Sequence, residues 1–123
     1  VLARLMNRYP EYDVTIDETH HTEKKDAPSG TALTLAGDLL GELARKTNWV
    51  NNAAKNGSEL AVLSHRVDKV PGTHAVRYTS AIDDIEIKHT AHNREGFALG
   101  AVLATEWIVG KHGVFSMEDM LEF

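Results

Sequence analysis

Three strand-like segments follow one another in the second half of the chain, and this run constrains the fold more than any other feature of the sequence. They read ELAVLSHR (59–66), THAVRYTSA (73–81) and DDIEIKHTA (83–91). In the third segment, Ile85, Ile87 and His89 share one face because side chains alternate along a strand. The turn between the second and third segments is short, so we expect these two to form an antiparallel hairpin.

A strand and a helix are predicted before this run. Val14 and Ile16 alternate with polar residues in YDVTIDE (12–18), a pattern typical of a half-buried strand. An amphipathic helix is predicted over 29–47, with Ser29 as its N-cap. Its apolar residues recur at spacings of three and four: Leu33, Ala36, Leu40 and Leu43.

The remaining segments complete the expected architecture. The polar stretch 48–59 is expected to be a surface loop, and SMEDML (116–121) a short helix capped by Ser116. The segment 94–111 is strongly apolar with helical periodicity, and its part 97–109 packs either in the core or against a partner subunit. Strands and helices that mix in this way, with consecutive strands late in the chain, indicate an α+β fold around one mainly antiparallel sheet.

Composition narrows the classes of function. A net charge of −5 argues against a nucleic-acid-binding protein, which needs a clustered excess of Lys and Arg. No apolar run approaches the roughly 20 residues of a membrane helix, so we expect no membrane contact. Cysteine is absent, which excludes disulfides and fits a cytoplasmic protein. The chain opens at Val1 without Met, on apolar residues at helical spacing, so we expect it to be part of a longer protein.

The segment ETHHTEKKDAPSGTA (18–32) carries the clearest chemical signal. Ser29, Gly30 and Thr31 open the predicted helix, and the first N–H groups of a helix attract a carboxylate or phosphate. The fold could bring the ammonium group of Lys24 to the same anion. Simple helix capping and solvated lysines are the alternatives that these residues leave open.

The histidine pair in this segment allows acid-base chemistry. His20 and His21 are adjacent, so in extended backbone at most one points into a given pocket. A histidine there could move a proton near neutral pH, although a surface pair is the alternative. His89 and His92 lack an obvious third ligand nearby in the sequence, and no HExxH helix occurs, so we expect no catalytic metal.

The segment 18–32 also resembles the signature of the dihydrodipicolinate reductase family of lysine biosynthesis, commonly E-x-H-H-x-x-K-x-D-A-P-S-G-T-A. IKHTAHNREGFALGAV (87–102) is similar to the family's H-x-A-x-x-R-x-x-F-A-x-G-A segment, and GVFSMEDML (113–121) to its closing helix. The resemblance covers nearly the whole chain. It identifies residues 1–123 with the family's C-terminal domain, which binds substrate and forms tetramers.

The resemblance implies a fold, an activity and partners. The fold would be a sheet of about four strands flanked by helices, shared between subunits of a homotetramer. The activity would be an NAD(P)H-dependent reduction that yields tetrahydrodipicolinate in diaminopimelate and lysine biosynthesis. NADH or NADPH would bind mainly to an N-terminal Rossmann domain outside this chain, which contains no GxGxxG turn.

The resemblance also implies roles for individual residues. His20 would be the proton donor, and Lys24 would hold one carboxylate of a dicarboxylate substrate and support protonation. His21 would line the substrate site. The second carboxylate would be bound by Ser29, Gly30 and Thr31. An alternative from another class is an oligomerisation module that binds dicarboxylates without turnover.

Overall fold

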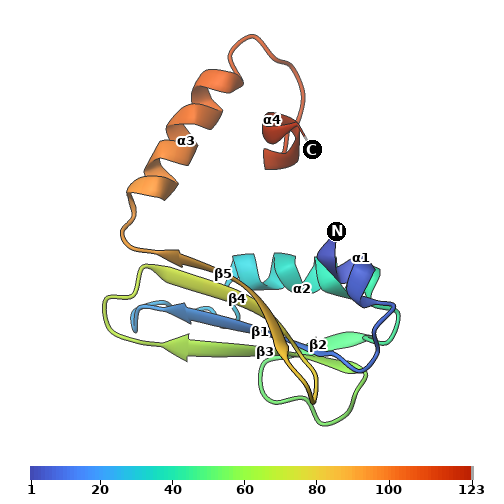
Figure 1. The fold of residues 1–123 in the computed structure, drawn as a ribbon. Helices are drawn as coiled ribbons and strands as arrows, with labels where there is room; N and C mark the ends of the chain where they lie inside the picture. Colours follow the sequence, from blue (N-terminus) through green and yellow to red (C-terminus); the bar gives the residue numbers. More distant parts are fainter. Residues whose placement is uncertain (123) are drawn as a thin grey trace. The chain divides into compact units, whose positions relative to one another are not determined.

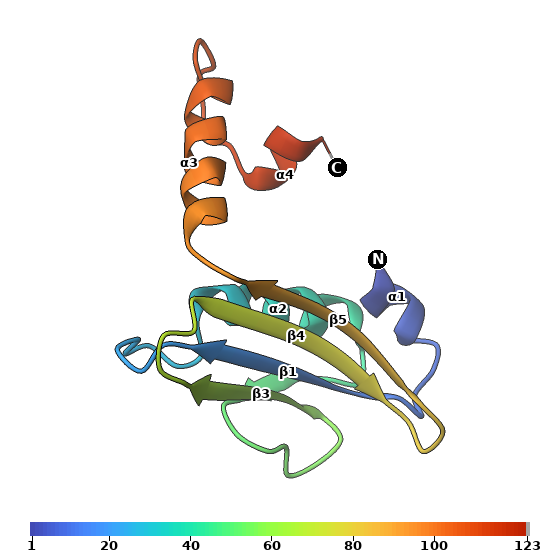
Figure 2. The same ribbon diagram turned by 60° about the vertical axis from the view of Figure 1, so that its left-hand side comes forward.

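A five-stranded mixed sheet is the main element of the structure, a computed structural model that describes residues 1–122 (Figure 1). Its strands are β1 (Asp13–His20), β2 (Asn48–Val50), β3 (Glu59–Arg66), β4 (Gly72–Thr79) and β5 (Asp84–Ala91). They lie in the order β2-β3-β1-β4-β5, with β1 between a parallel β3 and an antiparallel β4 (Figure 2). The α+β class and the antiparallel β4–β5 hairpin are confirmed, with five strands rather than about four.

The additional strand, β2, lies inside the segment 48–59, and our prediction of a loop was wrong for its first three residues. β2 pairs in parallel with β3, from Asn48 opposite Glu59 to Val50 opposite Ala61. Three residues at a sheet edge are too few to show the alternation that identifies a strand in a sequence. Residues 48–50 therefore form a strand because they pair with β3, and their own composition does not predict it.

Burial alternates along the whole of β1, which is flanked by neighbours on both edges. Val14 and Ile16 are fully buried, as predicted. The buried face then continues through Glu18 and His20, so the apolar half of the strand supplies the core and its polar end supplies buried charge. The core of this first compact unit, which spans Val1–His92, has the following buried members: Ala3, Met6, Val14, Ile16, Ala32, Ala36, Leu39, Leu43, Leu60, Val62 and Tyr78.

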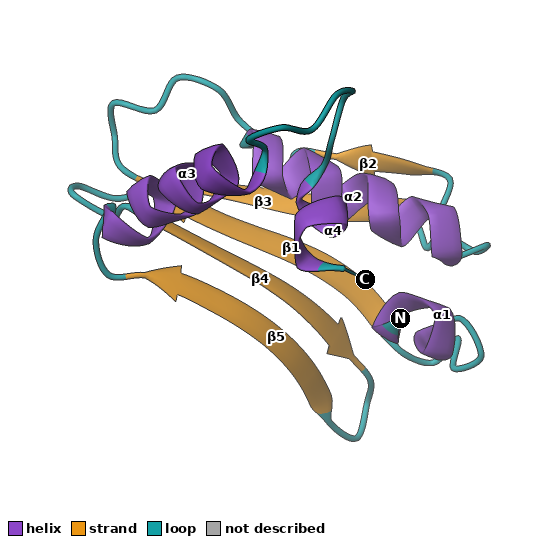
Figure 3. Ribbon diagram, turned by 90° about the horizontal axis from the view of Figure 1, so that it is seen from above, coloured by secondary structure: helices purple, strands orange, loops and turns teal. Residues whose placement is uncertain are grey.

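Helix α2 (Gly30–Glu42) lies across one face of the sheet, and α1 (Leu2–Met6) packs beside it (Figure 3). Ser29 caps α2 as predicted, by accepting the Ala32 N–H at 3.2 Å. The helix ends five residues earlier than the predicted position 47. Its buried stripe is Ala32, Ala36, Leu39 and Leu43. Ala36 and Leu43 are buried as predicted. Leu33 is 39% exposed, so the prediction was wrong there, because the small Ala32 faces the sheet in its place. Leu40 is only partly buried.

The second compact unit begins at Asn93 and contains α3 (Glu95–Trp107) and α4 (Met117–Leu121). The predicted cap of α4 is confirmed as a capping box, in which the side chains of Ser116 and Asp119 each bond the other's backbone N–H. Although α3 is apolar, none of its residues is buried among the residues that the structure describes. No helix within residues 1–122 is long and apolar enough to cross a membrane.

Candidate active site

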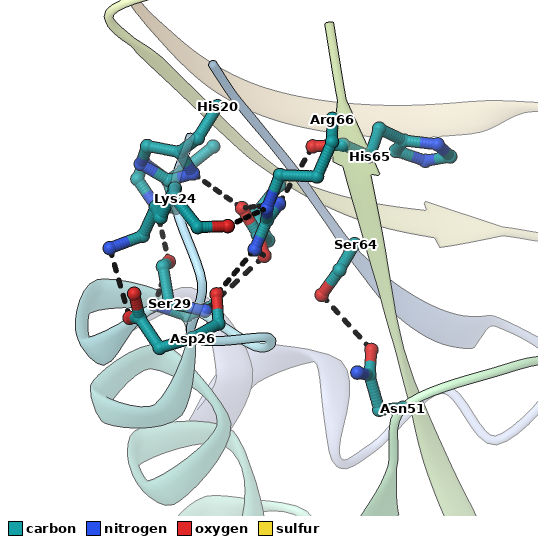
Figure 4. A network of polar contacts seen from close by, with 11 residues as sticks. His20, Lys24, Asp26, Ser29, Asn51, Ser64, His65 and Arg66 are labelled. Atoms are coloured by element: carbon teal, nitrogen blue, oxygen red, sulfur yellow. Dashed lines mark hydrogen bonds and ion pairs between the residues drawn. The ribbon is translucent and has the colours of Figure 1, made fainter. Parts of the chain in front are cut away.

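The carboxylate of Glu18, fully buried near the end of β1, is the centre of the candidate site. Its Oε2 lies 2.5 Å from Nδ1 of His20, and its Oε1 accepts the backbone N–H of Ser29 at 3.2 Å. Arg66 donates to both oxygens, from Nη2 to Oε1 at 2.9 Å and from Nη1 to Oε2 at 3.1 Å (Figure 4). A buried carboxylate needs such partners, because burial of an unpaired charge is very costly.

The strand register brings these side chains together from distant parts of the sequence. Glu18 lies opposite Ser64 on β3 and His74 on β4, and His20 lies opposite Arg66. Residues two apart on a strand point to the same face, so all of these side chains share the face that α2 covers. The first turn of α2 begins directly above the polar end of that face, since Ser29 contacts Glu18 there.

The electrostatics of this cluster determine which nitrogen of His20 carries a proton. Burial raises the pKa of the Glu18 carboxyl, but hydrogen bonds, foremost from Arg66, lower it more, so the pKa lies below its ordinary value. Glu18 is therefore ionised at neutral pH and can only accept hydrogen bonds. It follows that Nδ1 of His20 donates to Glu18, which leaves Nε2 for a different partner.

A second histidine, His74, lies against the first. The two rings meet edge to face with centroids 5.0 Å apart, and Nε2 of His74 is 3.0 Å from the Ser29 hydroxyl. Burial lowers the pKa of His74, and the neighbouring His20 lowers it further. His74 is therefore neutral at neutral pH, and it joins the Ser29 cap of α2 to the His20 ring.

The two lysines of the segment 18–32 differ in their surroundings. Nζ of Lys24 lies 2.9 Å from Oδ2 of Asp26, and its side chain is 24% exposed, whereas Lys25 is exposed. The hydrogen bond from Lys24 lowers the pKa of Asp26. Arg66 also fixes this loop, because it donates to the carbonyl oxygens of Lys24 at 3.2 Å and Asp26 at 2.6 Å. The loop that carries Lys24 is thus attached to the buried carboxylate through one guanidinium group.

The start of α2 is open to an incoming anion. Gly30 and Thr31 are exposed, and apart from the adjoining residues and the backbone of α2 itself no atom lies within 4 Å of the position that a Cβ on Gly30 would occupy. Within residues 1–122 their N–H groups have no acceptor. His21 is only partly buried, and its Nδ1 is a buried atom without a partner in the described part of the chain. The structure thus gathers the predicted residues into one region, and their individual roles stay predictions.

Sequence reasoning missed three members of the cluster: Glu18 as a buried anchor, Arg66 and His74. The alternation in β1 was the available signal, because Glu18 and His20 continue the register of Val14 and Ile16. Arg66 and His74 gave no such signal, since their proximity depends on how β3 and β4 pair with β1. Among the described residues, no group of three His, Cys, Asp or Glu side chains is placed to hold a metal ion.

Comparison with known proteins gives consistent matches. A family profile described as "Dihydrodipicolinate reductase, C-terminus" matches residues 1–121. A protein named 4-hydroxy-tetrahydrodipicolinate reductase from Christiangramia forsetii is 47% identical over 120 residues, which cover 98% of this chain and 50% of the relative. A protein of the same name from Methanosarcina barkeri is 43% identical over 115 residues, which cover 90% of this chain and 43% of the relative. The chain thus spans about half the length of these curated relatives.

One solved structure has a similar fold. It is described as dipicolinate-bound dihydrodipicolinate reductase from Paenisporosarcina sp. TG-14, and it superposes with a TM-score of 0.68 over 97% of this chain and 48% of that chain. At 24% sequence identity this likeness supports the fold alone. The family profile, which matches residues 1–121, supports a stronger conclusion than the fold alone. It shows that the chain belongs to the family of dihydrodipicolinate reductase C-terminal domains.

Proposed function

We propose that this chain is the substrate-binding domain of an NAD(P)H-dependent 4-hydroxy-tetrahydrodipicolinate reductase of lysine (diaminopimelate) biosynthesis. The observation that carries the proposal is the buried Glu18–His20 pair at 2.5 Å, placed beside the open start of α2. This arrangement combines a histidine that can deliver a proton with a site for a carboxylate. The names of the relatives support the same activity.

The substrate in this proposal is a cyclic dicarboxylate. The similar solved protein from Paenisporosarcina is described as dipicolinate-bound, which supports a dicarboxylate here. One carboxylate would lie at the positive end of the α2 dipole. It would accept hydrogen bonds from the N–H groups of Gly30 and Thr31 and from the hydroxyl of Ser29. Lys24 would exchange Asp26 for the other carboxylate, and His21 would line the site.

His20 is the proton donor of the proposed reaction. Its Nδ1 is engaged by Glu18, so the proton leaves from Nε2 toward the substrate while Glu18 stabilises the charged imidazolium form. A bound nicotinamide supplies the hydride in this chemistry. The residues of this chain do not fit a dinucleotide, because the turn before α2 reads PSGT and lacks the glycine-rich pattern that holds a pyrophosphate. We assign the cofactor to an N-terminal Rossmann domain of the full-length protein.

Assembly and location belong to the same proposal. We expect a homotetramer, because α3 exposes large apolar side chains that its own unit leaves uncovered. They include Phe97, Leu99, Val102 and Leu103. A biosynthetic reductase without cysteine fits the cytoplasm, where we place it.

The test uses the full-length protein, with NADH or NADPH oxidation followed in the presence of the cyclic substrate. We expect turnover in the parent and a kcat lower by roughly 10²–10⁴-fold in His20→Gln, with a smaller change in KM. Pyridine-2,6-dicarboxylate should bind in calorimetry and inhibit turnover. Binding of this probe without turnover of the parent would favour the oligomerisation module instead, and absence of both would refute the proposal.

A further inference from the structure

The Glu18–Arg66 pair offers no free group for direct contact with a substrate, which raises the question of what it does. Glu18 is fully buried, so it cannot touch a ligand that enters from solvent. Arg66 has five N–H donors, and all five are engaged. Two go to Glu18, and the other three go to the carbonyl oxygens of Lys24, Asp26 and His65. A saturated guanidinium group has no donor left for a substrate carboxylate.

The pair instead contacts both segments that carry the proposed chemistry. Glu18 binds Nδ1 of His20 directly, at 2.5 Å. Arg66 holds the backbone on both sides of Lys25, through the carbonyl oxygens of Lys24 and Asp26. Because the guanidinium group is planar, its five contacts fix the carboxylate and the lysine loop in one relative position.

Gly72 defines the other side of the histidine ring. A Cβ at this position would lie 3.2 Å from Nε2 of His20 and 3.4 Å from its Cδ2. At these distances the ring would have to shift by a few tenths of an ångström, and Glu18 holds that ring at Nδ1. The missing side chain of Gly72 therefore leaves space beside the nitrogen that Glu18 does not use.

We infer that Glu18 and Arg66 are positioning residues. Together they fix His20 with its proton on Nδ1 and with Nε2 free for the reaction. They also hold the loop that carries Lys24 in a fixed position relative to the His20 ring. This inference rests on the proposed function, because it assigns the pair to the same site. A pair that only tied β1 to β3 would be indifferent to the tautomer of His20, and this difference makes the inference testable.

The first measurement needs no substitution. The parent full-length protein is labelled with ¹⁵N-histidine, and long-range ¹⁵N–¹H correlation spectra are recorded while the pH is raised until His20 is neutral, with His20→Gln used to assign the signal. We expect neutral His20 to carry its proton on Nδ1. A neutral His20 with its proton on Nε2 would overturn the inference whatever the variants do.

The second measurement uses Glu18→Gln, with Asp17→Asn as a matched control. Asp17 precedes Glu18 on β1, points to the opposite face and contacts Nε2 of a different histidine, His65, at 3.2 Å. We expect Glu18→Gln to lower kcat by roughly 10²-fold or more with KM within about threefold, and to change the His20 spectrum. Asp17→Asn should leave kcat, KM and the His20 signal unchanged.

A third variant, Arg66→Lys, tests the link to the lysine loop. One ammonium group cannot replace five planar donors, so both kcat and KM should worsen, whereas Glu18→Gln affects mainly kcat.

A folded Glu18→Gln protein that keeps kcat within about threefold of the parent would overturn the inference. If Glu18→Gln does not fold, the parent spectrum decides. If the parent has no reductase turnover, the proposed function fails, and the spectrum still decides whether Glu18 sets the tautomer.

Discussion

Replacement of Arg66 by methionine removes the cation that faces the buried Glu18 carboxylate. Methionine keeps much of the side-chain length but loses all five hydrogen bonds of the guanidinium group, including the two to Glu18 at 2.9 and 3.1 Å. Glu18 is fully buried in the parent, so its carboxylate depends on protein partners for hydrogen bonds. Loss of one partner of a buried ion pair costs about 3–5 kcal/mol. We therefore expect Arg66→Met to lower the free energy of unfolding by about this amount at neutral pH.

The loss should depend on pH in a defined direction. In the parent the pKa of Glu18 lies below its ordinary value of 4.5, so its stabilising contribution is present above that value and is lost as pH falls through the folded-state pKa. Without Arg66 the effect of burial dominates, and the folded-state pKa moves above the unfolded one. The folded variant then gains stability from protonation as pH falls. The difference between the two proteins should therefore narrow between neutral pH and about pH 5.

Urea unfolding of this 123-residue chain, followed by circular dichroism at one protein concentration, measures the difference. Arg77→Met is the matched control, because Arg77 pairs with Glu86 at 2.7 Å with its side chain 47% exposed. An exposed pair contributes little, so this control should stay close to the parent. The reasoning is refuted if Arg66→Met costs less than about 1 kcal/mol, matches Arg77→Met, or shows the same loss at both pH values.

Three further predictions concern the full-length protein. Lys24→Ala should weaken substrate binding by about 1.5–3 kcal/mol and lower kcat in steady-state assays. Lys25→Ala removes an exposed charge and should change neither, and equal damage from both variants would contradict the role of Lys24 in binding a carboxylate. Gly72→Ala should lower kcat more than KM, since the new Cβ crowds Nε2 of His20, and a kcat equal to that of the parent would show that the ring can move aside. Leu103→Glu should reduce the tetramer population in sedimentation velocity, because it places a charge on the apolar helix α3; an unchanged tetramer would place this residue outside the interface.

Local patterns in the sequence were enough for much of the fold. Alternation located β1 and the β4–β5 hairpin, and the cap residues Ser29 and Ser116 marked two helix starts correctly. These features depend on neighbours in the chain. The buried stripe of α2 was predicted correctly at Ala36 and Leu43. It was misplaced at its start, because Ala32 and Leu33 both fit a helical period and only contact with the sheet selects between them.

The candidate site divides in the same way. Lys24, Ser29 and the histidine pair lie in one contiguous segment, so the family resemblance and the chemistry of a helix start could both find them. Arg66 could not be found, because it is 48 residues from Glu18 and reaches it only through the pairing of β1 with β3. In the sequence, Arg66 has no feature that distinguishes it from a solvent-exposed arginine at the end of a strand. The identity of the residue that keeps Glu18 ionised therefore depends on the fold and could not be predicted from local sequence.

The position of β1 between β3 and β4 also determines when the site can form during folding. The neighbours of Glu18 across the sheet are Ser64 and His74, so both pairings close long stretches of chain. Contacts between residues far apart in sequence form slowly, because the entropy of a long loop is lost before the contact stabilises it. The α2 segment can become helical through local contacts, whereas Glu18 meets Arg66 and His74 only when β3 and β4 pair with β1. A chain in which β3 and β4 have not yet paired with β1 therefore lacks the Arg66 and His74 contacts of the site, and the site forms together with these three strands.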